Sequence, residues 1–413
     1  MTTTAGRAAA YVHAVGWRTM SSPAAHGTAP VYLDHAATTP MRPEALEEMT
    51  RHLRSTGNAS SLHGAGRNAR RVVEEARERV AAAIGARPGE VIFTSGGTEA
   101  DNLAIKGIYW ARHGKDPGLT RVVSSPVEHH AVLDPLEWLA EEGAVVDFVP
   151  VDHKGRVQPS AVEHTLGHAD DVALVSVMWA NNEVGTVQPV SRIVELAHAR
   201  GVPVHTDAVQ AVGALPVDFA ASGADALTLT AHKLGGPYGV GALVASRGLG
   251  LTPLLHGGGQ ERQVRSGTLD VPAIAAFAVA TEIAVREQAD FARRMTQLRS
   301  LLVERMRAVV PDVVLNGDPV DRLPGNVHLT FPGCEGDSLL MLLDHQGVQV
   351  STGSACSAGV PQPSHVLLAM GRTEAEARGS LRVTFGHTST EADVEALVAA
   401  IGPIVERARA ALL

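Results

Sequence analysis

Along most of the chain, short runs of β-branched and aliphatic residues alternate with segments in which apolar residues recur at helical spacing. The run EVIFTS is followed by Gly96 and Gly97 and then by TEADNLAIKGIYWARHG. In that last segment, positions 100, 103, 104, 107, 108 and 111 follow the i, i+3, i+4, i+7 spacing of one helix face. Thr98 and Asp101 have the spacing of a capping box. This stretch therefore predicts a strand, a glycine turn and a helix capped by Thr98.

The same alternation continues toward the middle of the chain. VALVSVMWA predicts a buried strand, VSRIVELAHARG predicts a helix with Gly201 at its C-cap, and VPVHTD and ALTLT predict two more strands. Strand, helix and strand at this spacing form a βαβ unit, which requires a parallel sheet covered on both faces. The predicted fold class is therefore α/β, with a mainly parallel central sheet flanked by helices.

The pattern changes after about residue 285. EQADFARRMTQLRSLLVERMRAVV predicts a long helix, and NVHLTF, the STGSACSAG loop, SLRVTFG and a closing helix follow. This order predicts a smaller α+β domain. We therefore expect a large domain at residues 42–285 and a small domain made of residues 30–41 and 286–413. Residues 1–29 include no acidic residue and no apolar segment as long as that of a signal peptide, so we expect no secretory signal and either a disordered tail or a chain that really starts at Met20.

Composition narrows the classes of function that remain. Of the 413 residues, 45% are hydrophobic and 19% charged, which is typical of a globular chain. The net charge of −9 argues against broad binding to nucleic acid or to an anionic membrane. The apolar runs are shorter than the ~18 residues of a membrane helix. Two cysteines, Cys334 and Cys356, are too few for a disulfide framework and indicate a reducing, cytoplasmic location.

Three features at predicted strand ends could carry chemistry. Gly96, Gly97 and Thr98 form a strand-to-helix turn that could bind a phosphate. Asp207 ends VPVHTD, and Lys233 follows ALTLT. Each feature alone has an ordinary structural interpretation, as a packing turn, a strand-end cap or a surface lysine. Together they are the phosphate site, the acid for a ring nitrogen and the amine that pyridoxal 5'-phosphate requires.

Ten stretches, in order, extend this interpretation over most of the chain: YLDHAATTP, GNASSLHGAGR, FTSGGTEADNLAIKG, EHHAVLD, NNEVGT, HTDAVQAVG, AHKLGGPYGVGAL, GGGQERQVRSGT, GSACSAG and SLRVTFG. In them the chain resembles the group I cysteine desulfurases of the class V aminotransferase family, with the fold type I PLP-transferase fold. The resemblance implies an enzyme that converts L-cysteine to L-alanine and holds the sulfur on an enzyme cysteine as a persulfide. The sulfur would supply iron–sulfur cluster assembly, tRNA thiolation or both.

The resemblance also implies roles for individual residues. Lys233 would bind pyridoxal 5'-phosphate covalently, His129 would stack on its ring and move protons, and Cys356 would accept the sulfur. Arg382, with Asn182, would bind the substrate carboxylate. The cofactor contacts it implies are Gly97, Thr98, Asn182, Asp207, Gln210, Thr230, His232, Lys233 and Thr268, the last from the partner subunit of a homodimer. The family often has serine where this chain has Thr230, and the hydroxyl is retained.

The small residues around Cys356 favour a reactive thiol in a flexible loop, whereas Cys334 is expected to be structural. His129 and His130 are adjacent, but the chain has no HExxH or CxxC motif, and we expect no metal. Expected partners are L-cysteine and sulfur-acceptor proteins such as an iron–sulfur scaffold or a tRNA-thiolation enzyme, with no membrane and no direct nucleic-acid binding. A selenocysteine lyase, an aminotransferase of the same fold and a catalytically idle binding subunit remain as alternatives.

Overall fold

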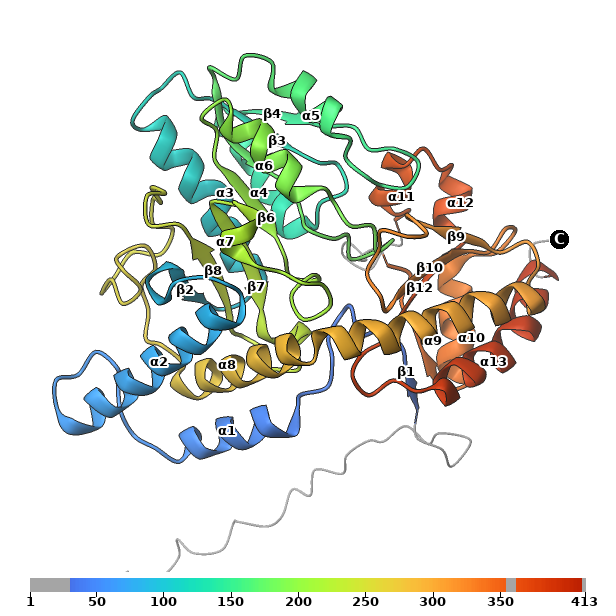
Figure 1. Cartoon of the computed structure of the whole chain (residues 1–413). Helices are drawn as coiled ribbons and strands as arrows, with labels where there is room; N and C mark the ends of the chain where they lie inside the picture. The colour runs from blue at the N-terminus through green and yellow to red at the C-terminus, as the bar shows by residue number, and fades with distance from the viewer. Residues whose placement is uncertain (1–29, 354–361, 411–413) are drawn as a thin grey trace, which may run out of the picture.

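Figure 1 shows the computed structural model of the chain, which describes residues 30–353 and 362–410. Its largest sheet has seven strands in the order β2-β8-β7-β6-β5-β3-β4. Neighbouring strands are parallel except at β8, which is antiparallel to β2 and to β7. In this order the strands are β2 (Val91–Thr94), β8 (Gly241–Ala245), β7 (Ala226–Thr230), β6 (Val204–Asp207), β5 (Val172–Ser176), β3 (Arg121–Ser124) and β4 (Val145–Phe148). The prediction of a mainly parallel sheet is confirmed.

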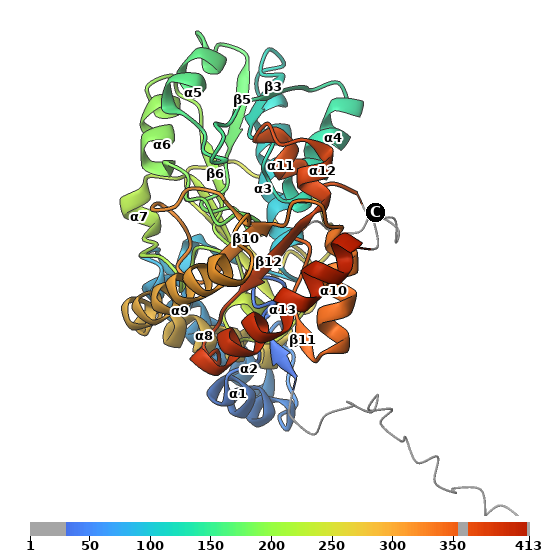
Figure 2. The same cartoon turned by 90° about the vertical axis from the view of Figure 1, so that its right-hand side faces the viewer.

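Helices cover both faces of this sheet (Figures 1 and 2). Alternate residues of β2 show why its sequence is apolar throughout: Ile92 packs in the apolar cluster on one face, and Phe93 packs in the cluster on the other. The helices around this sheet are α1 (Pro43–Leu53), α2 (Gly64–Ala83), α3 (Gly97–His113), α4 (His130–Glu141), α5 (Pro159–Leu166), α6 (Val190–His198), α7 (Phe219–Ser222) and α8 (Val271–Arg286).

The start of α3 differs from the predicted capping box. Gly96 is the N-cap, with φ of 151°, and no side chain caps the helix. This backbone conformation favours glycine, and it lets the chain turn so tightly that the helix begins at Gly97, before Thr98. Asp101 is buried and therefore does not serve as an exposed cap partner. The predicted C-cap at Gly201 is also displaced, because α6 ends at His198 and Gly201 forms the left-handed turn that follows.

The remaining elements build a smaller layer around a second sheet (Figure 2). Its order is β12-β10-β9, all antiparallel, and a two-stranded parallel sheet pairs β1 with β11. The strands are β1 (Val31–Tyr32), β9 (Val314–Asn316), β10 (Asn326–Thr330), β11 (Val348–Gln349) and β12 (Ser380–Thr384). The helices are α9 (Gln288–Val309), α10 (Gly336–His345), α11 (His365–Ala369), α12 (Glu374–Arg378) and α13 (Glu391–Ala410). The strands pack with α9, α10 and α13 in an apolar cluster separate from those of the large sheet, whereas α11 and α12 pack in a small cluster with Val127 and Val184. The domain limits themselves stay a prediction.

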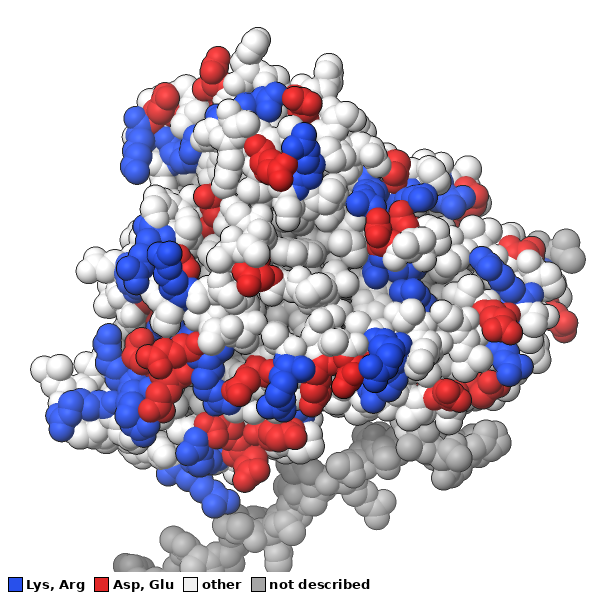
Figure 3. Space-filling view, viewed as in Figure 1, with Lys and Arg blue, Asp and Glu red and all other residues white. Residues whose placement is uncertain are grey.

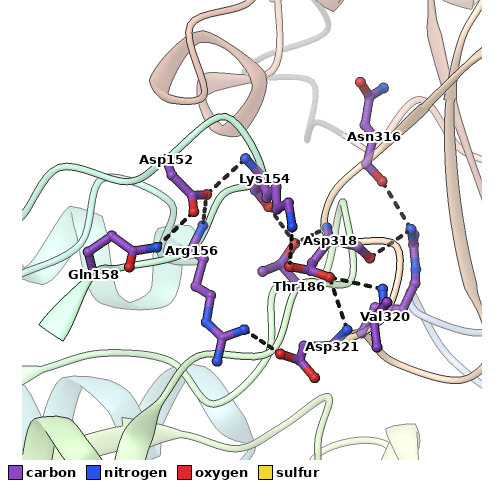
Figure 4. Close-up of polar contacts among 10 residues, drawn as sticks. Asp152, Lys154, Arg156, Gln158, Thr186, Asn316, Asp318, Val320 and Asp321 are labelled. Carbon is purple, nitrogen blue, oxygen red and sulfur yellow. Dashed lines mark hydrogen bonds and ion pairs between the residues drawn. The ribbon is translucent and has the colours of Figure 1, made fainter.

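Polar contacts join the two parts at one edge (Figure 4). Lys154 Nζ lies 3.2 Å from the Asp318 carboxylate, and Arg156 pairs with Asp321. Between them, the Thr186 hydroxyl donates to the carbonyl of Lys154 at 2.6 Å and accepts from the backbone N–H of Asp318 at 3.0 Å. These contacts hold the turn at residues 152–158 against the turn at residues 316–322.

Acidic and basic side chains are interspersed on the face drawn in Figure 3, with uncharged residues between them. Within residues 30–353 and 362–410, no helix is long and apolar enough to cross a membrane. The tail expected at residues 1–29 lies outside the described residues.

Candidate active site

A cavity of about 420 Å³ lies at the carboxyl ends of the parallel strands, where the large sheet faces the small one. Strand β6 ends at Asp207, and β7 leads directly into a short helix that ends at Lys233. Ten of the twelve residues predicted for the site line this cavity: Gly97, Thr98, His129, Asn182, Asp207, Gln210, Thr230, His232, Lys233 and Arg382. The structure thus brings together residues spread over nearly 300 positions of sequence.

The other two predicted residues are Cys356 and Thr268. Cys356 lies outside the described residues. The chain leaves the described region at Gly353, which lines the cavity, and shortly after re-entering it Ser364 donates to the Glu183 carboxylate at 2.5 Å. Thr268 does not line the cavity of its own chain. Because it was expected to serve the partner's site, its role stays a prediction.

Lys233 is the amine of the cavity. Its Nζ donates to the backbone carbonyls of Ala36 and Ala37, the second at 2.7 Å. Burial, with a smaller contribution from nearby Arg382, lowers the pKa of Lys233 to about 8. A substantial fraction of this amine is therefore neutral and nucleophilic at mildly alkaline pH.

Asp207 supplies a carboxylate on the neighbouring strand. Its Oδ1 accepts a hydrogen bond from the backbone N–H of Val209 at 2.8 Å. Burial raises the pKa of Asp207 to about 6, while this hydrogen bond and the charge of Lys233 act in the opposite direction. At neutral pH Asp207 is therefore ionised and can pair with a cation inside the cavity.

The N-terminus of α3 supplies an anion site beside this pair. The first backbone N–H groups of a helix have no partner within the helix, and its dipole favours negative charge there. Gly97 and Thr98 bring these groups to the cavity, where Thr230 and His232 also line the wall. Burial and Lys233 lower the pKa of His232 to about 4, so its ring is neutral. Together with Asp207 and Lys233, this donor set fits pyridoxal phosphate.

His129 lines the cavity from the start of α4. Its Nδ1 accepts from the backbone N–H of Ala131 at 3.0 Å, which places the ring proton of the neutral form on Nε2. Burial, followed by Lys233, lowers the pKa of His129 to about 4. While this bond persists, the neutral ring presents Nε2 to the cavity as a hydrogen-bond donor, and it takes up a proton only when Nδ1 releases the Ala131 N–H.

Arg382 reaches the cavity from the middle of β12, and its side chain is 6% exposed. Its Nη2 donates to Asp34 at 2.8 Å, and its Nη1 donates to the carbonyl of Asn182 at 3.2 Å. Backbone hydrogen bonds in both directions with Ser351 fix the strand beside the cavity. Within the described chain its Nε has no partner, so donor capacity remains for a carboxylate.

Several residues that line the cavity or pair with its residues were missed by the sequence analysis. Asp34 and the carbonyls of Ala36 and Ala37 belong to YLDHAATTP, a stretch used for the resemblance without assigning it a role. Asp101 also lines the cavity, although it was interpreted as a cap. Cys334 is buried, as expected for a structural thiol, and burial raises its pKa. In the part of the chain that the structure describes, no group of three His, Cys, Asp or Glu residues could hold a metal ion.

Comparisons with known proteins agree with this geometry. The sequence model of the family described as aminotransferase class-V matches residues 31–397. An IscS-like cysteine desulfurase from Mycobacterium tuberculosis is 57% identical over 385 residues, covering 92% of this chain and 98% of that protein. A cysteine desulfurase IscS from Dictyoglomus turgidum is 43% identical over 380 residues, covering 92% of this chain and 95% of that protein.

Solved structures give the same result. A NifS-like protein superposes with a TM-score of 0.85 at 36% identity, covering 92% of this chain and all (100%) of that one. A structure described as SspA in complex with cysteine superposes with a TM-score of 0.75 at 33% identity, covering 86% of this chain and 98% of that one.

Proposed function

Since this chain belongs to the aminotransferase class-V family and functions as a cysteine desulfurase, we propose that it binds pyridoxal 5'-phosphate in the cavity and transfers the sulfur of L-cysteine to Cys356. The observation that carries the proposal is the convergence of Lys233, Asp207 and Arg382 on one cavity. An amine, a ring-nitrogen partner and a carboxylate site are what an amino-acid substrate and this cofactor need together.

The cofactor would be held by residues from three elements. The N-terminus of α3 with Gly97 and Thr98 would bind its phosphate, Asp207 its ring nitrogen, and Lys233 its reactive carbon. Gln210, whose amide donates to the Ala36 carbonyl at 2.9 Å, lies at the same wall of the cavity. When bound, pyridoxal phosphate withdraws electrons from the Cα of an attached amino acid, which weakens the bonds at that carbon.

The chain's own groups would bind and orient the substrate. Arg382 would hold the carboxylate of L-cysteine through charge-assisted hydrogen bonds, with Asn182 at the same wall. Lys233, as a neutral amine, would accept a proton when the substrate binds. His129 would direct its Nε2–H toward the reacting atoms, and it would move a proton once Nδ1 releases the Ala131 N–H and becomes free to be protonated.

Sulfur transfer would take place at Cys356. Its thiolate attacks the sulfur of the substrate, the new S–S bond forms, and the C–S bond breaks. The electron pair of the broken bond stays with the substrate carbon, which takes up a proton to give L-alanine. The enzyme keeps the sulfur as a persulfide, so the step needs no external oxidant or reductant.

The wider setting follows from the same proposal. We propose a cytoplasmic homodimer in which Thr268 of each subunit completes the other's phosphate site. Persulfide sulfur would pass to acceptor proteins, such as an iron–sulfur scaffold or a tRNA-thiolation enzyme. The support for these proposals is the resemblance to the family and the two-cysteine composition of the chain.

The test measures L-alanine formed from L-cysteine in the presence of a reductant, for wild type, Cys356→Ser and the matched control Cys334→Ser. We expect wild type and Cys334→Ser to form alanine and Cys356→Ser to lose activity while still binding the cofactor. Equal activity in all three would rule out Cys356 as the acceptor. Cofactor binding without alanine in any of them would point to an aminotransferase, and turnover of selenocysteine alone to a selenocysteine lyase.

A further inference from the structure

A second buried acid lies in the cavity beside Asp207. Asp101 comes one turn after the Gly97–Thr98 turn of α3, and its side chain is 1% exposed. It lines the same cavity as Asp207, and within the described residues its Oδ1 has no hydrogen-bond partner. The mechanism above gives this carboxyl no role, yet a fully buried carboxylate without a cation is costly.

The polar groups behind Asp101 form a hydrogen-bonded row across three neighbouring strands. The Ser176 hydroxyl lies 2.9 Å from Nδ1 of His205, and Nε2 of His205 lies 3.0 Å from the Thr228 hydroxyl. The Thr228 hydroxyl in turn contacts Asp101, whose Oδ1 is 3.6 Å from His205 Nε2. Ser176, His205 and Thr228 are fully buried, so their polar groups depend on one another for hydrogen bonds.

The hydrogen-bonded row behind Asp101 brings no positive charge to it. Burial lowers the pKa of His205 to about 3, so its imidazole is neutral and has one donor and one acceptor in either tautomer. The other titratable groups that act on Asp101 are Asp207 and Glu128, both acidic, and they raise the pKa of Asp101 further above its usual range. Asp101 is thus surrounded by neutral or negative groups.

Asp207, unlike Asp101, has a backbone hydrogen-bond donor and a positive charge nearby. It accepts the Val209 N–H, and Lys233 acts on it with a favourable charge. Two adjacent buried carboxyl groups cannot both ionise at low cost, so the pair shares one proton. The partners of Asp207 favour its charged form, whereas at Asp101 burial and the charges of Asp207 and Glu128 favour the neutral form and only the Thr228 hydroxyl acts against them.

We propose that Asp101 is a positioning residue that stays protonated and, as a neutral polar neighbour, keeps Asp207 ionised where the ring nitrogen of the cofactor binds. This inference rests on the proposed function, because it assigns Asp207 to that nitrogen. It predicts that the proton of the pair lies on Asp101 across the neutral pH range. It also predicts that an amide can replace Asp101, whereas an apolar side chain cannot.

The first test is infrared spectroscopy of the protein without substrate at pH 8, comparing wild type with Asp101→Asn. We expect the C=O band of a buried, protonated carboxylic acid in wild type and its loss in Asp101→Asn. Glu128→Gln is the matched control, because Glu128 is also fully buried and burial raises its pKa. Loss of one component in each variant supports the proposal. A spectrum that Asp101→Asn leaves unchanged means that Asp101 is ionised and overturns it.

The second test measures the dissociation constant for pyridoxal phosphate and the pH titration of its visible absorption in Asp101→Asn, Asp101→Leu and Thr228→Val. We expect Asp101→Asn to stay within about twofold of wild type and Asp101→Leu to bind roughly tenfold more weakly, with a shifted titration. Thr228→Val should move in the same direction by less. If Asp101→Leu does not fold, the cofactor affinities of Asp101→Asn and Thr228→Val still test the proposal.

Equal effects of Asn and Leu at position 101, or none from either, would overturn the inference. Neither test uses turnover of L-cysteine. A wild type that binds the cofactor but forms no alanine would refute the proposed function and leave both comparisons valid.

Discussion

The two sheets deliver polar groups to the cavity in different ways. In the large sheet, polar groups reach it from the ends of strands: Asp207 and Thr230 are the last residues of β6 and β7. In the small sheet, Arg382 stands in the middle of β12, and the residues on either side of it along the strand, Leu381 and Val383, point into an apolar cluster.

This alternation extends across the small sheet. Residues 326, 328 and 330 of β10 and 380, 382 and 384 of β12 are all polar, and all are buried. The residues between them pack against α9, α10 and α13. A polar sheet face normally meets water, whereas this one is covered and must satisfy its groups internally. Asn316 does so in part, because its amide contacts His328 at 3.1 Å and Thr330 at 2.8 Å.

The comparison shows how the residues that stabilise the fold are separated from the residues that face the cavity. In the large sheet the two roles divide along each strand, with the core in the middle and the chemistry at the end. In the small sheet they divide between adjacent residues, because successive side chains point to opposite faces. Substitutions at neighbouring positions of β12 should therefore have unrelated consequences.

The largest effect is expected at a strand end. Lys233→Met removes the amine that we propose to bond the cofactor, so alanine formation should fall by roughly 10²–10⁴-fold or more. Steady-state assays with added pyridoxal phosphate measure this loss. Retention of more than a tenth of wild-type activity would contradict the role of Lys233.

The next effect is expected on the apolar face of the small sheet. Leu381 is 1% exposed, and Leu381→Ala should lower the free energy of unfolding by about 2–5 kcal/mol through lost burial and a residual cavity. Denaturant unfolding measures this change. The KM for L-cysteine should stay within twofold of wild type, and a large rise in KM would show that the two faces are not separate.

Lys233→Met should also change the pH dependence of stability in the cofactor-free protein. A native pKa of about 8, against 10.5 for the unfolded chain, means that the unfolded state binds more protons between these values. Wild-type stability should therefore rise with pH through this window. The variant lacks this rise and should be more stable at pH 7 by at most roughly 3 kcal/mol. Parallel unfolding curves at pH 7, 8 and 9 that leave the difference constant would argue against it.

A smaller effect is expected on the polar face. Arg382→Lys keeps the charge but loses the planar donor geometry, so the KM for L-cysteine should rise by about 10–100-fold. Because Arg382 and Leu381 are adjacent, this variant tests the comparison directly. Its free energy of unfolding should change much less than that of Leu381→Ala, and equal destabilisation would contradict the separation of roles.

The smallest effect is expected at the edge shown in Figure 4. Arg156 pairs with Asp321, whose side chain is 55% exposed. Exposed ion pairs contribute little, so Arg156→Gln should change the free energy of unfolding by less than about 1 kcal/mol. Activity should be unchanged, and a tenfold loss would mean that this edge controls the cavity.

Sequence alone predicted the strand ends well because they are local. The apolar run before Asp207 and the glycines beside Lys233 each mark the end of a strand within a few residues. Assignment of the cavity residues rested on resemblance, since no local pattern says which strand ends meet. The cap assigned to Asp101 was wrong because spacing cannot show whether a carboxyl in the first turns faces solvent or the interior. The backbone conformation of Gly96 sets where α3 begins and therefore which way the Asp101 carboxyl faces.

The polar face of the small sheet was visible in part. NVHLTF and SLRVTF alternate between polar and apolar residues, which predicts two different faces. Alternation alone predicts that the polar face meets water. That this face is buried against the cavity depends on contacts such as Arg382 with Asp34, which are 348 residues apart in sequence.

The contact between Asp34 and Arg382 also bears on the time at which this enzyme becomes active. Ribosomes make the chain from its N-terminus at roughly 5–20 residues per second, and domains can fold as they emerge. Asp34 is made long before Arg382, because the two residues are 348 positions apart in sequence. A nascent chain that stops before residue 382 therefore lacks the group that we propose to bind the carboxylate of L-cysteine, and sulfur transfer should begin only after Arg382 has been made.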